Sequence, residues 1–528
     1  MSEKSDKRWL LAGALLLIIV IVGIVINQNH EIKDSTKFAS TMDIDNGDQK
    51  INWNRYATTD VELTESYEIT KPGIYHLTGE IEDGLITITL SKNEPVKLIL
   101  DNVTIKNSTG PAILCNEADD LVIELIGDNY LRDGSEYDTK YNEDIKGAVY
   151  SKSDTTFEGE GTLNLVANQE DGIVSKDDLK FNSGTYIISA VDDAIRGKDS
   201  VYIINGEYEL EVGADGIKST NESDTGKGFV LIENGDFKIK SGAKGIKAIN
   251  SIIIYDGTFA IDSYDDAIHT NNYIGISGGE YEITSGDDGV HANKELIVDK
   301  GKIVITKAYE GLEAQVITIN GGEIDILATD DGMNAGGGAD ASANNRPGAG
   351  AFDADMNCIL SINGGEIYIN ASGDGIDSNG YLYFNGGKVV VDGPTNNGNG
   401  AIDAGADVVM NGGEVIAIGA SGMAKNLGQN SKIYNISVYL DTNYPKATEI
   451  EIKNATGETV LSHISTKTFN HIAAGSEKFS LGETYTIYLD DEKYEAFTIS
   501  DIVTTIGNNR NGGGQNGQPM PPTQPTRR

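Results

Sequence analysis

The chain has 528 residues, enough for several ordinary domains or one long repeat array. Its formal net charge of −40 at pH 7 excludes nucleic acid as a partner, because DNA and RNA are bound through basic surfaces. The 63 glycines recur at fixed places, so they indicate a repeat and not low complexity.

The N-terminus carries an apolar run of 18 residues, 9–26, after a basic segment at 1–8. Such a run is just long enough to span a bilayer core of about 30 Å. Lys4, Lys7 and Arg8 precede it and no Lys or Arg follows until Lys33, so the positive-inside rule places the rest of the chain outside. A cleaved signal peptide is the alternative, although residues 27–30 lack the small-x-small pattern. We therefore expect a cell-surface protein with a single membrane span and a linker over 27–55, or a secreted protein if the segment is cleaved.

A phrase of the type "SGDDGVHA" recurs along the chain, and its Gly or Ala is used here as a marker. Five of the seven intervals between consecutive markers are 22 residues long. Segments between markers, such as "EYEITSG" and "EIDILATD", alternate apolar and polar residues, which predicts strands. A unit of this length fits one coil of a parallel β-helix, whereas a propeller blade needs roughly 40 residues. The markers are Gly172, Ala194, Gly216, Gly245, Ala267, Gly289, Gly311 and Gly332.

We predict an all-β fold with a parallel β-helix of roughly a dozen coils of ~22 residues over 56–425. The 29-residue interval holds an outward loop at 219–228, and the Gly- and Ala-rich stretch 336–355 is expected to be a long surface excursion. Residues 426–507 look like a small antiparallel β module that covers the open end of the helix. The tail 508–528 is rich in Gly, Asn, Gln and Pro, and we expect it to be disordered.

Acidic residues next to the markers form a column, because stacked coils place equivalent residues about 4.8 Å apart. Like charges at this spacing repel one another, and a cation with several oxygen ligands removes the conflict. Calcium (Ca²⁺) fits because it accepts irregular geometry, carbonyl groups and water; for any one coil, an Asx turn is the alternative. The predicted calcium ligands are Asp171, Asp192, Asp193, Asp215, Asp265, Asp266, Asp287, Asp288, Asp330, Asp331 and Asp374.

A second column lies two residues after each marker and changes from basic to acidic along the chain. The residue between it and the marker is apolar, so this column faces outward. Cations beside metal-binding carboxylates suit an anionic, extended polymer, and a ladder of ion pairs between neighbouring side chains is the alternative. A further column of asparagines, Asn250, Asn271, Asn293 and Asn379, is expected to be structural. The predicted substrate-binding residues are Arg196, Lys218, Lys247, His269 and His291.

Stretches such as "VKLILDNVTIKNSTGPAI" and "GADGIKSTNESDTGKGFVLIENGDFKI" resemble a family of bacterial cell-surface carbohydrate-binding proteins. The family is typified by clostridial proteins that bind cellulose and acidic polymers such as polygalacturonate, and the resemblance runs from about Tyr67 to Met423. It implies a right-handed parallel β-helix, calcium held by aspartates, and similarity to pectate lyases without established catalysis. The positions that match the family's acidic phrases are Asp171, Asp192, Asp193, Asp215, Asp287 and Asp288.

These observations together predict a calcium-dependent protein that binds polysaccharide. An acidic, pectin-like polymer is favoured over cellulose, because cellulose is usually bound on flat aromatic platforms and the exported part has only Trp53. A calcium-dependent pectate lyase is one alternative, with Lys218 or Arg196 as the base, and a calcium-stabilised adhesin without a glycan ligand is another. We lean toward a protein that is not an enzyme and assign no catalytic residue.

Overall fold

The computed structural model describes residues 34–44, 48–141, 144–336 and 354–508. The expected membrane span at 9–26, most of the Gly- and Ala-rich stretch and nearly all of the C-terminal tail lie outside these ranges. Within them, no helix is long and apolar enough to cross a membrane.

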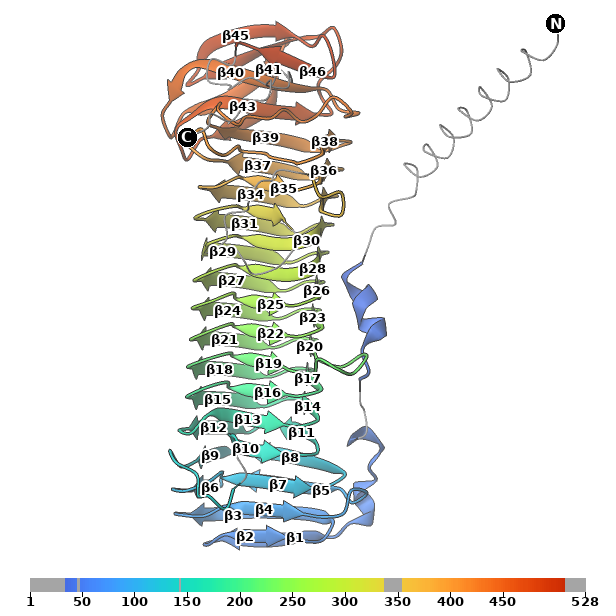
Figure 1. Ribbon diagram of the computed structural model, residues 1–528, viewed down its shortest axis with the longest axis vertical. Coiled ribbons are helices and arrows are strands. Elements are labelled where there is room, and N and C mark those ends of the chain that lie inside the picture. The colour runs from blue at the N-terminus through green and yellow to red at the C-terminus, as the bar shows by residue number, and fades with distance from the viewer. Residues whose placement is uncertain (1–33, 45–47, 142–143, 337–353, 509–528) are drawn as a thin grey trace, which may run out of the picture. The chain divides into compact units, whose positions relative to one another are not determined.

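The residues from Thr58 to Gly419 wind into a β-solenoid of about 14 turns (Figure 1), somewhat more than the dozen expected. A complete turn contributes three strands, and each strand pairs in parallel with its equivalents in the turns before and after it. One turn, for example, comprises β22 (Ile246–Ala248), β23 (Ser251–Ile254) and β24 (Thr258–Ser263). It pairs in register with β25 (Ile268–Thr270), β26 (Tyr273–Ile276) and β27 (Glu280–Ser285) of the next turn. The all-β class and the parallel β-helix are thereby confirmed.

The stacked strands form three parallel sheets. The first sheet holds the short strands that follow the markers: β2 (Tyr67–Ile69), β4 (Ile86–Thr89), β7 (Ile113–Glu117), β10 (Gly147–Ser151), β13 (Asp171–Ser175), β16 (Ile195–Gly197), β19 (Ile217–Ser219), β22, β25, the first halves of β28 (Val290–Val298) and β30 (Leu312–Ile319), β32 (Met333–Ala335) and β35 (Ile376–Ser378).

The second sheet comprises β1 (Thr58–Leu63), β3 (Gly73–Ile81), β5 (Val96–Asp101), β8 (Asp120–Ile126), β11 (Asp154–Gly159), β14 (Asp178–Phe181), β17 (Ser200–Ile203), β20 (Phe229–Ile232), β23, β26, the second halves of β28 and β30, β33 (Ile359–Ile362), β36 (Tyr381–Phe384) and β38 (Asp407–Met410). The third sheet starts at the end of β3 and continues with β6 (Thr104–Lys106), β9 (Asp128–Arg132), β12 (Thr162–Ala167), β15 (Thr185–Ala190), β18 (Glu207–Val212), β21 (Asp236–Ser241), β24, β27, β29 (Lys302–Ala308), β31 (Glu323–Ala328), β34 (Glu366–Ala371), β37 (Lys388–Asp392) and β39 (Glu414–Gly419).

The interior is filled by the apolar residues of the alternating strands. In β18, β21 and β24, exposed and buried residues alternate without exception. Equivalent buried rings stack along one corner of the solenoid, with centroids 4.7–5.1 Å apart from Tyr186 to Tyr281. The repeat in sequence therefore becomes a continuous core, since each turn covers the apolar face of its neighbour.

The C-terminal residues form a cap on the solenoid (Figure 1). Strand β43 (Phe469–Ser476) runs antiparallel to β39 and to β40 (Asn435–Tyr444), and β46 (Val503–Ile506) runs parallel to β40. A separate antiparallel sheet has the order β42 (Thr459–Ile464), β41 (Glu449–Asn454), β44 (Thr484–Leu489) and β45 (Glu492–Thr498). Because β43 pairs with β39, the last strand of the third sheet does not end in an open edge.

A segment that we expected to be a linker docks on the outside of the second sheet instead. Its 3₁₀ helices are η1 (Ser35–Thr41), η2 (Asp48–Lys50) and η3 (Trp53–Arg55). We call residues 35–44 the strap. Its Ser35 donates to Asp299 Oδ2 through both N–H (2.9 Å) and Oγ (2.6 Å), and Phe38 stacks on Tyr273 with centroids 4.7 Å apart. The packing of Phe38 against apolar side chains of β20, β23 and β28 explains why this piece of the linker is ordered.

Candidate functional site

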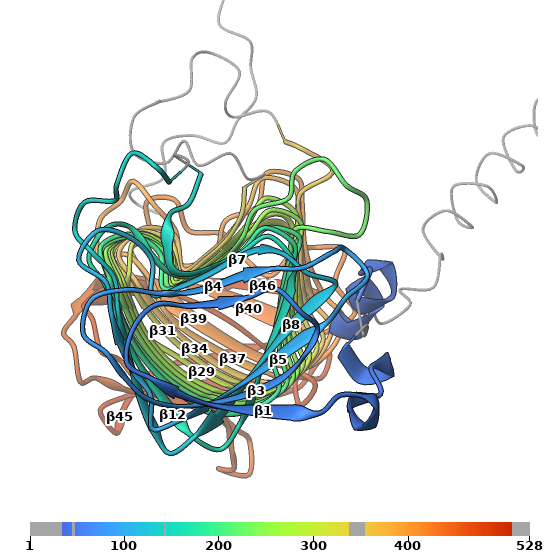
Figure 2. The same cartoon turned by 90° about the horizontal axis from the view of Figure 1, so that it is seen from below.

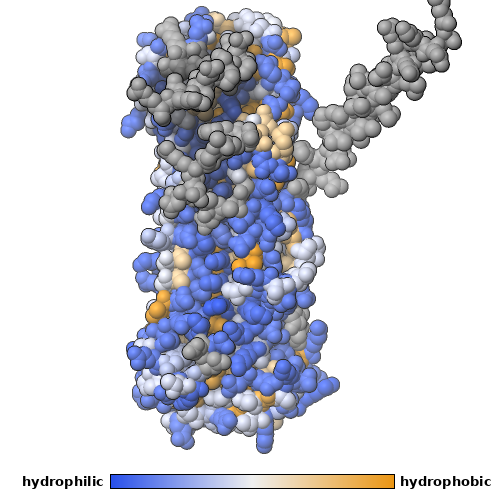
Figure 3. Space-filling model, viewed as in Figure 1, coloured by the Kyte–Doolittle hydropathy of each residue, from blue (hydrophilic) through white to orange (hydrophobic). Residues whose placement is uncertain are grey.

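The first sheet lies on the side of the solenoid where the backbone is concave. Seen end-on, the coils bend inward on the side of β4 and β7, between two shoulders (Figure 2). The side that carries the short strands faces the viewer in Figure 1, and its surface is mostly hydrophilic (Figure 3). All the predicted site residues lie in or beside the turns that lead into this sheet.

The marker itself is small because successive turns approach closely there. A Cβ atom on Gly216 would lie 2.5 Å from the carbonyl oxygen of Gly245 and 2.7 Å from Cγ2 of Ile239. The marker glycines do not have the positive φ that a sharp bend would require. Close packing between turns, and not a tight bend, therefore explains why the marker residue is small. The close approach lines up the residue before each marker with its equivalents.

We call the residues immediately before the markers the acid column. In this column Asp171, Asp193, Asp215, Asp266 and Asp288 are buried, and each uses Oδ1 to accept the backbone N–H of the equivalent residue in the next turn. These hydrogen bonds are 3.0–3.1 Å long. Half of each carboxylate therefore connects neighbouring turns, which is a structural role that the sequence did not reveal.

The other oxygen of each aspartate faces the outward column of cations. Lys218 Nζ lies 3.0 Å from Asp193 Oδ2 and 2.8 Å from Asp215 Oδ2, and Arg196 Nη1 lies 3.2 Å from Asp171 Oδ2. Lys247 Nζ lies 3.8 Å from Asp215 Oδ2. Lys244 stands in the acid column itself, and its Nζ is 2.6 Å from Asp266 Oδ2. As far as Asp266, the column is therefore balanced by an ion-pair ladder.

The two histidines of the outward column are enclosed. His269 is 5% exposed and its Nδ1 lies 2.7 Å from Asp266 Oδ2; His291 is fully buried. Against the effect of burial, the carboxylates of Asp288 and Glu313 raise the pKa of His291 to about 9. Neither ring is exposed for contact with a polymer, in contrast to our expectation for this column.

Beyond β30 the acid column is no longer balanced. In the described part of the chain, no ion pair joins Asp331 or Asp374 to a cation. Burial and the charges of Asp374 and Asp377 raise the pKa of Asp331 to about 9, and burial raises the pKa of Asp374 to about 7 and that of Asp377 to about 6. We call Asp330, Asp331, Asp374 and Asp377 the acid cluster.

The acid cluster has the donors that calcium requires. A Cβ atom on Gly373 would lie 2.3 Å from both Asp330 Oδ1 and Asp331 Oδ1, so the two carboxylates converge over this glycine. All the donors are oxygen atoms, and they carry an excess of negative charge, as a hard divalent cation prefers. Of the residues of the acid cluster, Asp377 was not among our predicted ligands, although its place in the outward column could have indicated it.

The remaining predicted ligands form an outer row of half-exposed or exposed aspartates. Oxygen atoms of Asp265, Asp266 and Asp287 lie within 4.8 Å of one another, as do those of Asp171, Asp192 and Asp193. Among the described residues, the structure thus separates Asp171, Asp193, Asp215 and Asp266, which are ion-paired with lysine, arginine or histidine, from Asp331 and Asp374, which are not; Asp288 is ion-paired with His291.

A groove lies beside the acid column, where β21, β24, β27 and β29 end. It crosses four successive turns and has a volume of about 970 Å³. Tyr264, 80% exposed, stands in it with Tyr309, and Lys240 and Lys307 contribute positive charge. None of these four residues was among the predicted site residues, and the two lysines occupy solvent-facing positions of ordinary strands.

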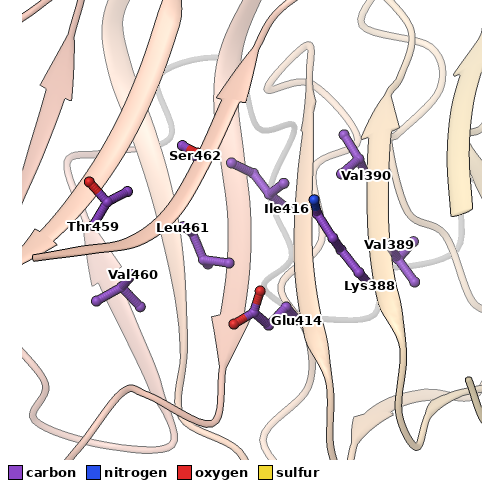
Figure 4. Close-up of a pocket in the computed structure, with 9 residues that line it drawn as sticks. All are labelled: Lys388, Val389, Val390, Glu414, Ile416, Thr459, Val460, Leu461 and Ser462. Atoms are coloured by element: carbon purple, nitrogen blue, oxygen red, sulfur yellow. The ribbon is translucent and has the colours of Figure 1, made fainter. Parts of the chain in front are cut away.

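A smaller cavity of about 130 Å³ lies where the solenoid meets the cap (Figure 4). Its walls come from β37, β39 and β42, and Lys388 and Glu414 stand beside valine, isoleucine and leucine side chains. It is smaller than the 300–1,000 Å³ usual for ligand pockets, so the groove is the better candidate.

Comparisons with known proteins agree with a role in carbohydrate binding. A family described as carbohydrate-binding domain-containing protein matches residues 64–267 and 247–344, together more than half of the chain. A carbohydrate-binding domain-containing protein of Acetivibrio thermocellus is 30% identical over 194 residues, which cover 35% of this chain and 66% of the relative. A solved structure of the polysaccharide lyase-like protein from C. thermocellum, as a gadolinium derivative, is 27% identical; the match covers 46% of this chain and 96% of that one, with a TM-score of 0.38.

Proposed function

We propose, since the chain belongs to the family of carbohydrate-binding domain-containing proteins, that its groove binds an extracellular polysaccharide. The polymer is acidic, of the polygalacturonate type, and calcium holds it to the protein. A single N-terminal span displays the solenoid at the cell surface.

The groove is the observation that carries this proposal. Its walls repeat every turn, about 4.8 Å apart, so an extended polymer meets the same kind of surface at each step. Tyr264 offers an exposed ring on which a sugar can stack, and Lys240 and Lys307 can pair with uronate carboxylates. The lining also holds Asp262, Asp265 and Asp287, so an acidic polymer needs a bound cation there as well as the lysines.

Calcium dependence is supported by the acid cluster. The raised pKa values of Asp331 and Asp374 mean that these carboxyl groups hold protons near neutral pH, and a bound cation replaces those protons. Calcium accepts six to eight oxygen ligands, so it can hold protein and polymer carboxylates together. The cluster lies along the same row of turns as the groove, with Asp330 following Tyr309 by one turn.

The environment of Lys218 argues against lyase chemistry. Burial alone would lower the pKa of this lysine, but the charges of Asp193 and Asp215 outweigh burial and raise it. A catalytic base at neutral pH needs the opposite shift. Arg196 is held by Asp171, so neither candidate base is prepared for proton abstraction.

The test is binding of the full-length protein to polygalacturonate with calcium or with a chelator, while absorbance of unsaturated product is followed. We expect calcium-dependent binding without product. The affinity of Tyr264→Ala for the polymer should be at least about tenfold weaker than that of the wild type, as for a central aromatic contact. Leu481→Ala, which removes an exposed apolar side chain from the cap, is the matched control.

Each part of the proposal can fail separately. Unchanged affinity of Tyr264→Ala would exclude the groove, and full binding in chelator would exclude calcium. Steady formation of product would establish a lyase instead.

A further inference from the structure

A fully buried histidine faces two carboxylates where the turns of β28 and β30 meet. Nδ1 of His291 lies 3.1 Å from Asp288 Oδ2 and 3.1 Å from Glu313 Oε2. One donor atom from each of the three residues lies within 4.8 Å of the other two. We propose that Asp288, His291 and Glu313 form a binding site for a first-row divalent metal, with zinc as the best fit. This site is independent of the polysaccharide groove and of the calcium proposed at the acid cluster.

The convergence of two carboxylates on one ring nitrogen distinguishes this histidine from the other histidines that the structure describes. An imidazole nitrogen carries one hydrogen, which can point directly at only one acceptor. His76 also lies between two carboxylates, but it uses Nδ1 for Asp60 (2.9 Å) and Nε2 for Asp101 (3.1 Å). A metal ion placed about 2.0–2.2 Å from Nδ1 and from both oxygens satisfies all three at once.

The charges around His291 leave room for a divalent cation. Asp288, Glu310 and Glu313 are three acidic side chains in close proximity, and the ring of His291 contacts two of them. The nearest cations on the preceding turns, Lys244 and His269, are paired with Asp266. In the described residues no lysine or arginine is ion-paired with any of the three carboxylates.

A separate observation concerns the other nitrogen of the ring. Nε2 of His291 is buried and has no hydrogen-bond partner. A positively charged imidazolium would bury this N–H as an unpaired charged donor, which costs more than an unpaired donor on a neutral ring. A neutral ring bound to a metal through Nδ1 avoids that charge. The side chain of Glu313 is 13% exposed, so the metal can reach the site from that side.

The donor set identifies the class of metal. One imidazole nitrogen and two carboxylate oxygens suit zinc and neighbouring first-row ions, whereas calcium is held by oxygen donors. Among these ions, zinc is bound strongly and has no redox chemistry, which makes it the most suitable probe. The assignment gives Asp288 a different metal from the one expected from sequence and gives His291 a role as ligand.

The test is calorimetric titration of zinc into the full-length, metal-free protein in saturating calcium. We expect one zinc per chain, with affinity at least about tenfold weaker in His291→Gln. The matched control, His76→Gln, removes the other imidazole between two carboxylates and should bind zinc as the wild type does.

A second variant guards against a folding defect. Glu313→Gln keeps the size and shape of the side chain, so it should fold normally and still lose zinc affinity. The proposal is overturned if the wild type takes up no zinc, if both variants bind zinc as well as the wild type, or if calcium displaces the zinc completely.

Discussion

Asp266 and Asp331 hold equivalent places in the acid column but have opposite electrostatic surroundings. Asp266 Oδ2 accepts from Lys244 Nζ at 2.6 Å and from His269 Nδ1 at 2.7 Å. Against the effect of burial, His269 and Lys244 hold the pKa of Asp266 well below its usual range. Asp331 is surrounded by carboxylates, and burial with their charges raises its pKa to about 9. Replacement of each aspartate by asparagine should therefore change stability in opposite directions.

The expected magnitudes follow from these surroundings. Asp266→Asn leaves Lys244, whose side chain is 8% exposed, with only Asp265 as an acidic partner, and loss of one partner of a buried pair costs about 3–5 kcal/mol. Asp331 must take up a proton on folding at pH 7, because its pKa is 3.8 in the unfolded chain and about 9 in the folded one. At about 1.4 kcal/mol per pKa unit this costs up to roughly 4 kcal/mol, which Asp331→Asn removes. The asparagine oxygen can still accept the N–H of Asp374.

Urea unfolding in chelator, followed by circular dichroism, measures both effects. A carboxyl with a raised folded pKa contributes full stability below pH 3.8, and this stability is lost as the pH rises toward about 9. Asp331→Asn should flatten this part of the pH profile and raise the unfolding midpoint at pH 7. With calcium present, the wild type should instead be more stable than Asp331→Asn, because the wild type gains binding energy that the variant lacks. The electrostatic reasoning would be refuted if, in chelator, Asp331→Asn destabilised the protein as much as Asp266→Asn does.

Three further substitutions test other parts of the molecule. Phe237→Ala removes a ring stacked 4.7 Å from Tyr208 and Phe259, and should lower the free energy of unfolding by about 3–5 kcal/mol in urea titrations. Burial lowers the pKa of His471 to about 3, so stability is lost as the pH falls from 6.5 toward 3. The difference in melting temperature between pH 7 and pH 4 should therefore be smaller in His471→Asn than in the wild type. Phe38→Ala should release the strap, seen as faster limited proteolysis within residues 35–55 while the far-ultraviolet circular dichroism stays unchanged.

The repeat could be predicted from sequence because its signals are local. Alternation of apolar and polar residues identified the strands, and the spacing of the markers identified the turns. The direction of the aspartate side chains could not be read in the same way. Whether Asp193 binds a metal or the N–H of Asp215 depends on the next turn, 22 residues later. The balance between Asp266 and Asp331 likewise depends on whether a lysine or another acid stands in the neighbouring turn.

The asparagines show the same limit. We expected a structural column at Asn250, Asn271, Asn293 and Asn379, but the asparagine that donates to Asn250 Oδ1, at 3.1 Å, is Asn272. The regular ladder lies elsewhere, in the "NGG" turns, where side-chain amides pair at 2.8 Å from one turn to the next. Its members are Asn320, Asn363, Asn385 and Asn411. The sequence analysis did not identify the asparagine of these turns as a cross-turn contact.

The strap has a consequence for the order of events during synthesis. Ser35 is made early, yet its partner Asp299 follows 264 residues later. At roughly 5–20 residues per second, the strap waits about 13–50 s before its docking surface exists. Turns can stack on one another as they emerge from the ribosome, because each contacts only its neighbours. The strap, translated before the solenoid, is thus docked only after the middle turns exist, and its docking requires that these turns have stacked.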